Sequence, residues 1–278
     1  MDVTTLRTAG FVSFEYPQGL RTAVQTALES WQLFCTLPLE QKRLLSGGDR
    51  VHDFGFMCRN DKGPVADRKE LFHALRANFP QLLPKAAKVC DPRATAFIRA
   101  VDTLLEATAP TVRAFAASVE EAYGLVGFTK LVMESQPHWT FRYLHYPKGS
   151  AVLAHPHADR GGFTFHLAET EGGGEYYSFD KQWLPWPVSA ERTIIFPSME
   201  LQHYSNGAMK ALWHRVLPVE HSTNARYAMV VFIDFQGLYR FDDSTHRVQN
   251  FAPGFNYHLP FKEFAGLFVP RDNITPAA

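Results

Sequence analysis

The amino-acid sequence predicts a mainly β core, a sandwich or barrel, preceded by an α-rich N-terminal part. From about residue 131 to residue 240, short apolar or alternating runs are separated by Pro, Gly and Asn, a pattern typical of antiparallel strands. Before residue 131, longer stretches carry apolar residues at helical spacing. Because no Gly/Ser-rich or Pro-rich linker separates the parts, we expect one domain over 1–278: an α-rich part over 1–130, the β core over 131–240 and a C-terminal tail over 241–278.

The N-terminal part is expected to hold one strand and two helical regions. Residues 10–14 alternate apolar and polar side chains, which predicts a strand. Residues 20–37 place apolar side chains on one helical stripe. A second helical region covers 94–123, where Pro110 predicts two helices or one kinked helix. Gly124 is a suitable C-cap for it.

The β core is expected to contain six strands. Each corresponds to a short apolar or alternating run bounded by turn-forming residues. The expected strands cover 139–146, 162–167, 175–179, 193–196, 212–219 and 227–235.

Composition excludes several functional classes. The 28 Lys and Arg balance the 28 Asp and Glu, which argues against nucleic acid or an anionic membrane as a partner. No run approaches 18 apolar residues and no signal peptide is visible, so we expect no membrane span. The three cysteines form no CxxC pair, which fits a cytoplasmic protein.

The sharpest local feature is the run His-Pro-His-Ala-Asp over 155–159. In an extended segment, positions i and i+2 point to the same side, so His157 and Asp159 can reach one metal ion. His214, on a later expected strand, is the best third ligand. Two His and one carboxylate are typical of non-haem Fe(II) oxygenases. His155 is a rival ligand, and a zinc site is an alternative.

Arg226 and Tyr146 are candidates for binding an anion. Arg226 begins the apolar run 227–235, and a guanidinium at the mouth of a β core suits a bidentate contact with a carboxylate. Tyr146 could add a phenolic donor to the same anion. The ordinary alternatives are a surface salt bridge for Arg226 and a half-buried strand tyrosine for Tyr146.

Several short motifs follow one another in a fixed order along the chain. In their order and spacing they resemble the isopenicillin N synthase-like branch of the Fe(II)/2-oxoglutarate-dependent oxygenases. The motifs are FCTLPLEQK over 34–42, DRKELF over 67–72, HAD over 157–159 with GFTF over 162–165, GGG over 172–174, SNG over 205–207 and HRV over 214–216.

This resemblance implies a distorted double-stranded β-helix, or jelly roll, with flanking helices. It implies iron ligation by the predicted triad of two histidines and one aspartate. Arg226 would pair with the far carboxylate of 2-oxoglutarate, with Tyr146 beside it, and Phe232 would line the pocket. The implied cofactors are Fe(II), 2-oxoglutarate as co-substrate and O2, and the family allows for ascorbate as a reductant.

Two positions depart from the family pattern. Ala228 stands where the family has a Ser two residues after its Arg, and Leu144 stands where it has an Asn. Each missing hydrogen bond is worth about 0.5–1.5 kcal/mol net, so 2-oxoglutarate binding would be weakened yet retained through Arg226. A same-fold Fe(II) oxidase that does not use 2-oxoglutarate is one alternative, and a non-catalytic metal-dependent ligand-binding protein is another.

The predicted function is therefore a dioxygenase that couples decarboxylation of 2-oxoglutarate to hydroxylation, desaturation or cyclisation of a small organic substrate. Arg142 lies four residues before Tyr146, so on a regular strand it shares the inward face and could meet an acidic group of the substrate. A salt bridge at the barrel rim is the alternative for Arg142. Phe232 is the second candidate for the substrate pocket.

Overall fold

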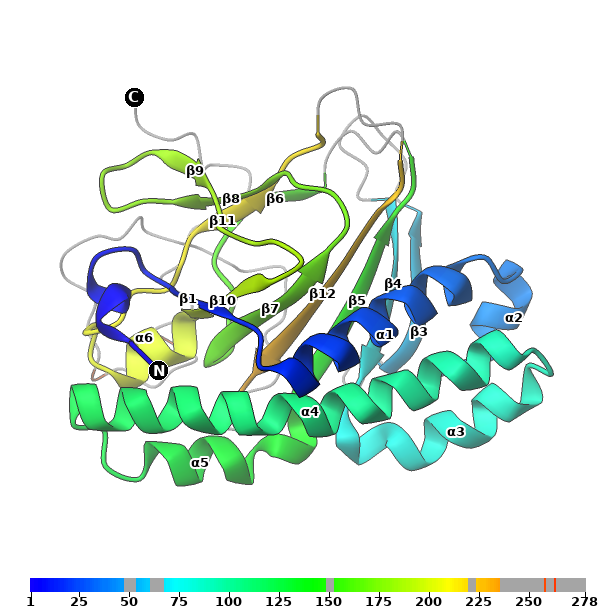
Figure 1. Cartoon of the computed structure of the whole chain (residues 1–278), viewed down its shortest axis with the longest axis horizontal. Coiled ribbons are helices and arrows are strands. Elements are labelled where there is room, and N and C mark those ends of the chain that lie inside the picture. Colours follow the sequence, from blue (N-terminus) through cyan, green and yellow to red (C-terminus); the bar gives the residue numbers. More distant parts are fainter. Residues whose placement is uncertain are drawn as a thin grey trace.

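Two antiparallel sheets and a layer of helices make up the protein in the computed structural model (Figure 1). The structure describes residues 1–47, 54–60, 68–148, 153–219 and 224–235, together with 258 and 263. The predicted C-terminal tail over 241–278 lies outside the described residues, apart from His258 and Glu263. Within the described chain, no helix is both long enough and apolar enough to cross a membrane.

The large sheet has eight strands in the order β1-β10-β7-β12-β5-β4-β3-β2. These strands are β1 (Val12–Glu15), β2 (Ser46–Gly47), β3 (Phe54–Asn60), β4 (Arg68–Ala74), β5 (Thr140–Tyr146), β7 (Phe163–Glu169), β10 (Arg192–Pro197) and β12 (Arg226–Ile233). The small sheet has the order β6-β11-β8-β9. Its strands are β6 (Ala154–His157), β8 (Gly174–Tyr177), β9 (Trp183–Pro185) and β11 (His214–Val216).

This topology confirms the predicted mainly β class and all six strands expected in the core. It also adds strands that the sequence did not indicate. The N-terminal part supplies four strands of the large sheet, β1 to β4, of which the alternation over 10–14 predicted only β1. β3 and β4 pair with each other, and β4 then pairs with β5, so the sheet extends beyond the predicted β core.

The helices lie along the lower side of the large sheet in the view of Figure 1. The α-helices are α1 (Gln18–Cys35), α2 (Leu39–Arg43), α3 (Phe79–Lys88), α4 (Pro92–Tyr123), α5 (Phe128–Glu134) and α6 (Met199–Tyr204). Short 3-10 helices cover Thr4–Arg7, Arg76–Asn78 and Gln136–His138.

α4 is one helix that runs through Pro110, so of the two arrangements that Pro110 predicted, two separate helices is wrong. Pro110 is exposed, and burial of the apolar stripe on the opposite side offsets the backbone hydrogen bond that proline removes. The side chain of Asp91 caps the first turn by accepting from the backbone N–H of Arg93, at 2.9 Å. Gly124 ends the helix as predicted, with a positive φ of 66°.

An aromatic cluster between α1, α4 and the large sheet fixes the position of β5. Trp31 is fully buried and stacks on Phe34, with ring centroids 5.5 Å apart. Phe97 from α4 and Tyr143 from β5 pack edge to face, at 5.1 Å. The indole N–H of Trp31 donates to the carbonyl of Leu144 at 3.0 Å. These contacts hold β5, the strand that carries Arg142 and Tyr146, against the helical layer.

A buried ion pair links the two N-terminal motifs of the sequence. The ammonium of Lys42 lies 2.6 Å from Glu70 Oε1 and also donates to the carbonyl of Cys35, at 3.1 Å. The second carboxylate oxygen of Glu70 lies 2.9 Å from His145 Nδ1. The ring of His145 in turn stacks on Tyr227 of β12. One lysine thereby ties the end of α1 to three neighbouring strands.

Replacement of Lys42 by Met should destabilise the fold strongly. It would leave the Glu70 carboxylate in a largely buried place without its ammonium partner, at a cost of about 2–3 kcal/mol. Urea denaturation followed by circular dichroism measures this free energy of unfolding. Lys130→Met is the control, because Lys130 forms only an exposed pair with Glu134 and should change stability little. Equal effects of the two substitutions would contradict a structural role for the Lys42 pair.

Candidate functional site

Three potential metal ligands converge at the edge of the small sheet. His157 is the last residue of β6, Asp159 follows two residues later, and His214 is the first residue of β11. His157 and His214 are register partners on adjacent antiparallel strands, and their ring centroids lie 4.3 Å apart. The potential ligand atoms of the three residues all lie within 4.8 Å of one another. His155 is exposed and is not part of this cluster.

Backbone carbonyls fix the tautomers of both histidines. His157 Nδ1 lies 2.7 Å from the carbonyl of His155, and His214 Nδ1 lies 3.1 Å from the carbonyl of Leu212. A carbonyl only accepts, so Nδ1 carries the proton in each ring and Nε2 presents its lone pair. The Nε2 atoms lie 3.5 Å and 3.8 Å from the carboxylate oxygens of Asp159. Three electron-pair donors thus face one another.

The protonation states of this cluster also suit metal binding. Burial would by itself raise the pKa of Asp159, but the neighbouring His214 and His157 rings and the hydrogen bond from Thr164 hold it far below its ordinary value. Burial, followed by the neighbouring His157 ring, lowers the pKa of His214 to about 4. Near neutral pH, Asp159 is therefore a carboxylate and His214 is neutral. Two imidazoles and one carboxylate fit a divalent transition metal and leave further coordination positions open.

Thr164 of β7 orients the carboxylate of Asp159. Its hydroxyl donates to Asp159 Oδ2 at 2.6 Å and also contacts the hydroxyl of Ser198, at 3.1 Å. Thr164 is buried, so this contact restricts the rotation of the Asp159 side chain. The sequence placed Thr164 within a motif without indicating that it would orient the carboxylate.

Arg226 and Tyr146 lie together as predicted, at one end of β12 and β5. The two residues are register partners, and the guanidinium of Arg226 lies over the ring of Tyr146, 5.6 Å from its centroid. Arg226 is only 5% exposed, which rules out the surface salt bridge considered as its alternative. Its Nε donates to the carbonyl of Gly172 at 3.3 Å, and its Nη2 lies 2.5 Å from Glu169 Oε2.

Sequence reasoning missed Glu169, the last residue of β7. Its carboxylate accepts from Trp186 Nε1 at 3.3 Å and pairs with His166 Nε2 at 3.2 Å. Burial alone would raise the pKa of Glu169, but the contact with His166 and the positive charge of Arg226 bring it below its ordinary value. Glu169 is therefore a charged carboxylate. Glu169 lies two residues beyond the strand expected over 162–167, and nothing in the sequence indicated that its side chain would be buried.

Arg142 and Phe232 also contact each other. The guanidinium of Arg142 lies over the ring of Phe232, 4.6 Å from its centroid, and its Nε donates to His73 Nε2 at 2.7 Å. Asp234 follows Phe232 by two residues. Burial, and then the charge of Asp159, raises the pKa of Asp234 to about 7. The charge of Arg142 acts in the opposite direction and lowers the pKa of Asp234, so Asp234 is close enough to feel both charges. The sequence did not indicate this proximity.

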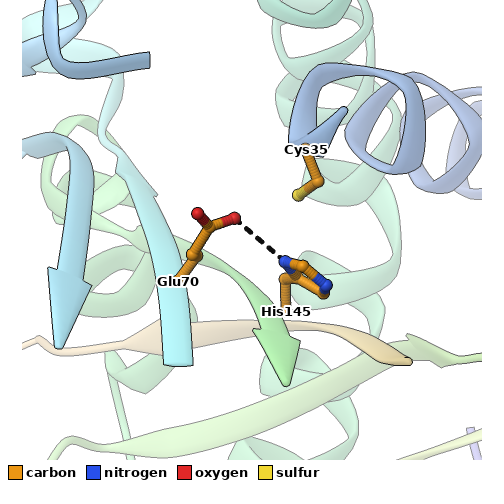
Figure 2. A group of neighbouring side chains, drawn as sticks. All are labelled: Cys35, Glu70 and His145. Atoms are coloured by element: carbon orange, nitrogen blue, oxygen red, sulfur yellow. Dashed lines mark hydrogen bonds and ion pairs between the residues drawn. The ribbon is translucent and has the colours of Figure 1, made fainter. Parts of the chain in front are cut away.

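A second group of potential metal ligands among the described residues consists of Cys35, Glu70 and His145. Figure 2 shows the Cys35 thiol directed toward the Glu70–His145 pair. The ammonium of Lys42 already supplies the cation here, 2.6 Å from Glu70. Burial, and then the charge of Glu70, raises the pKa of the Cys35 thiol far above its ordinary value, so the thiolate that a metal requires is disfavoured. We therefore assign this group to stability.

Comparison with known proteins gives one family. Residues 135–235 match the sequence profile of the 2OG-Fe(II) oxygenase superfamily. This region contains both histidines and the aspartate of the cluster, together with Tyr146, Glu169 and Arg226.

Solved structures show the same fold at low sequence identity. One is a 2OG-Fe(II) oxygenase family protein from Caulobacter crescentus, 22% identical, with a TM-score of 0.71 over 94% of this chain and 89% of that chain. Another is a full-length protein from Neurospora crassa, solved in complex with alpha-KG, which is 17% identical, with a TM-score of 0.68 over 82% of this chain and 76% of that one. These likenesses confirm the predicted double-stranded β-helix with flanking helices.

A curated relative agrees with this family. Jasmonate-induced oxygenase 1 from Arabidopsis thaliana is 22% identical over 222 residues, which cover 75% of this chain and 53% of the relative. The chain thus spans about half the length of the relative that it matches. The profile match over residues 135–235 and the likeness of fold thus agree: the chain resembles the 2OG-Fe(II) oxygenase superfamily.

Proposed function

We propose that the protein is an Fe(II)- and 2-oxoglutarate-dependent dioxygenase. It would couple oxidative decarboxylation of 2-oxoglutarate to hydroxylation, desaturation or cyclisation of a small organic molecule. The convergence of two Nε2 lone pairs and one carboxylate, with both histidine tautomers fixed by backbone carbonyls, carries this proposal. The profile match over residues 135–235 and the likeness to the Neurospora crassa protein solved with alpha-KG support it.

Each residue of the site has a distinct task in this proposal. His157, Asp159 and His214 would hold Fe(II), and Thr164 keeps the carboxylate of Asp159 oriented. The bound iron would supply the oxidising power for O2-dependent chemistry. Arg226 would bind the far carboxylate of 2-oxoglutarate, with Tyr146 as a wall beside it.

The substrate would lie next to Arg142 and Phe232. Their contact places a cation over an apolar surface, which suits a substrate with an acidic group and an apolar body. The electrostatic link from Arg142 through Asp234 to Asp159 supports a pocket close to the metal. We also propose a cytoplasmic location, which the three free cysteines support.

A second candidate function is a same-fold Fe(II) oxidase that takes no electrons from 2-oxoglutarate. The ion pair between Arg226 and Glu169 favours it, because the cation expected to bind the co-substrate already has a carboxylate partner. Stoichiometric release of succinate with product would exclude this candidate.

Anaerobic addition of Fe(II) and 2-oxoglutarate should produce a weak visible charge-transfer band. His214→Ala should abolish the band, because it removes a metal ligand from the cluster. His155→Ala should retain the band, since it keeps the backbone carbonyl that accepts from His157 Nδ1. Absence of the band in the unmodified protein at saturating ligand would refute the proposed function.

Arg226→Ala should weaken 2-oxoglutarate binding while iron stays bound. Loss of charge-assisted hydrogen bonds worth about 1.5–3 kcal/mol corresponds to a rise in Kd of about 10- to 100-fold. Titration of the charge-transfer band measures this Kd, and metal analysis measures the iron content. Arg192→Ala, at an exposed strand position, is the control. An unchanged Kd would reject Arg226 as the binding residue.

A further inference from the structure

Arg226 already has an anionic partner within the chain. The ion pair with Glu169 is buried, since 5% of the Arg226 side chain and 10% of the Glu169 side chain are exposed. Nη2 of Arg226 donates to Glu169, and Nε donates to the carbonyl of Gly172. Groups of the chain itself therefore occupy the side-on edge of the guanidinium, which consists of Nε and Nη2. A side-on bidentate contact with an external carboxylate would have to displace both of these partners.

The strand register explains why Glu169 reaches this place. Glu169 lies directly opposite Ala228 on β12, and Ala228 lies two residues from Arg226 on the same face of the sheet. On the other side, Ala228 pairs with Leu144 of β5. The side chains of Ala228 and Leu144 form no hydrogen bonds. Among the three paired residues Leu144, Ala228 and Glu169, only Glu169 can therefore form an ion pair with the guanidinium of Arg226.

Glu169 is held in this orientation by more than Arg226. Trp186 Nε1 and His166 Nε2 both contact its carboxylate, at 3.3 Å and 3.2 Å. A second carboxylate brought to Arg226 would lie within a few ångströms of Glu169 in a poorly solvated place. Like charges at that distance repel strongly, because little water screens them.

We propose that Glu169 is an internal competitor for Arg226 and thereby sets the affinity and selectivity of the site for its co-substrate. This inference rests on the proposed function. A dicarboxylate such as 2-oxoglutarate can pair side-on with Arg226, through Nε and Nη2, only after the Glu169 contact is broken. A 2-oxo acid without a far carboxylate does not pair with Arg226, so Glu169 does not compete with it.

The test compares two ligands that differ only at the far end. 2-Oxopentanoate has the carbon chain of 2-oxoglutarate, with a methyl group in place of the far carboxylate. Calorimetric titration of both acids into anaerobic Fe(II)-loaded protein gives their Kd values without turnover. Glu169→Gln should bind 2-oxoglutarate about tenfold more tightly than the unmodified protein, and 2-oxopentanoate equally well. Glu169→Ala should change the two affinities in the same directions.

Glu171→Gln is the matched control, because it removes the same charge two residues away. Glu171 accepts a hydrogen bond from the side-chain amide of Asn224, at 3.1 Å. Its affinity for 2-oxoglutarate should stay that of the unmodified protein. A tenfold gain in the affinity of Glu171→Gln for 2-oxoglutarate would overturn the proposal. The gain would then come from the loss of any nearby negative charge and not from the loss of the Glu169 contact.

Two further outcomes would overturn the competitor role. One is an unchanged or weaker affinity of both Glu169 variants for 2-oxoglutarate. The other is an equal gain for 2-oxopentanoate, which would indicate general loosening of the pocket. If neither acid binds any iron-loaded protein, the proposed function itself fails, and this result is distinguishable from the failure of competition alone.

Discussion

The pairing of β6 with β11 is the constraint on which the site depends. It sets His157 directly opposite His214, and the same two backbone segments supply the carbonyls that fix both Nδ1 protons. Asp159 enters from the residues that follow β6, and Thr164 of β7 orients it. A shift of one residue in this register would turn one imidazole to the opposite face of the sheet. The large sheet and the helices serve to hold this edge in place.

Two buried ion pairs have different roles: we assign one to stability and propose that the other takes part in binding. Lys42 and Glu70 tie α1 to β4, and through His145 to β5 and β12. One residue further along the same strands, on the opposite face of the sheet, Arg226 and Glu169 form a pair of similar burial next to Tyr146. The first pair joins structural elements and contributes to stability. We propose that the second opens when a co-substrate binds Arg226. In a chain with zero net charge, selectivity would then depend on buried local pairs rather than on a long-range field.

The sequence predicted much of this because its signals were local. The i, i+2 spacing identified His157 and Asp159 as candidate metal ligands. Short apolar runs between turn residues predicted six strands of the core. Pro110 did not decide between two helices and one, because its effect depends on packing across the helix, which a local pattern does not contain. The place of Glu169 depends on which strand lies beside β12, and that neighbour is fixed only by the tertiary fold. For the same reason Asp234 gave no signal: its raised pKa comes from burial and from Asp159, far away in the sequence.

X-ray absorption at the iron edge of the anaerobic Fe(II)-loaded protein tests the central claim most directly. The account predicts a first shell of nitrogen and oxygen donors with two imidazoles, and a change of that shell when 2-oxoglutarate is added. A sulfur donor would place the iron at Cys35 instead. A closed shell that 2-oxoglutarate leaves unchanged would mean that the metal at His157, Asp159 and His214 has no open positions. Either result would contradict the account.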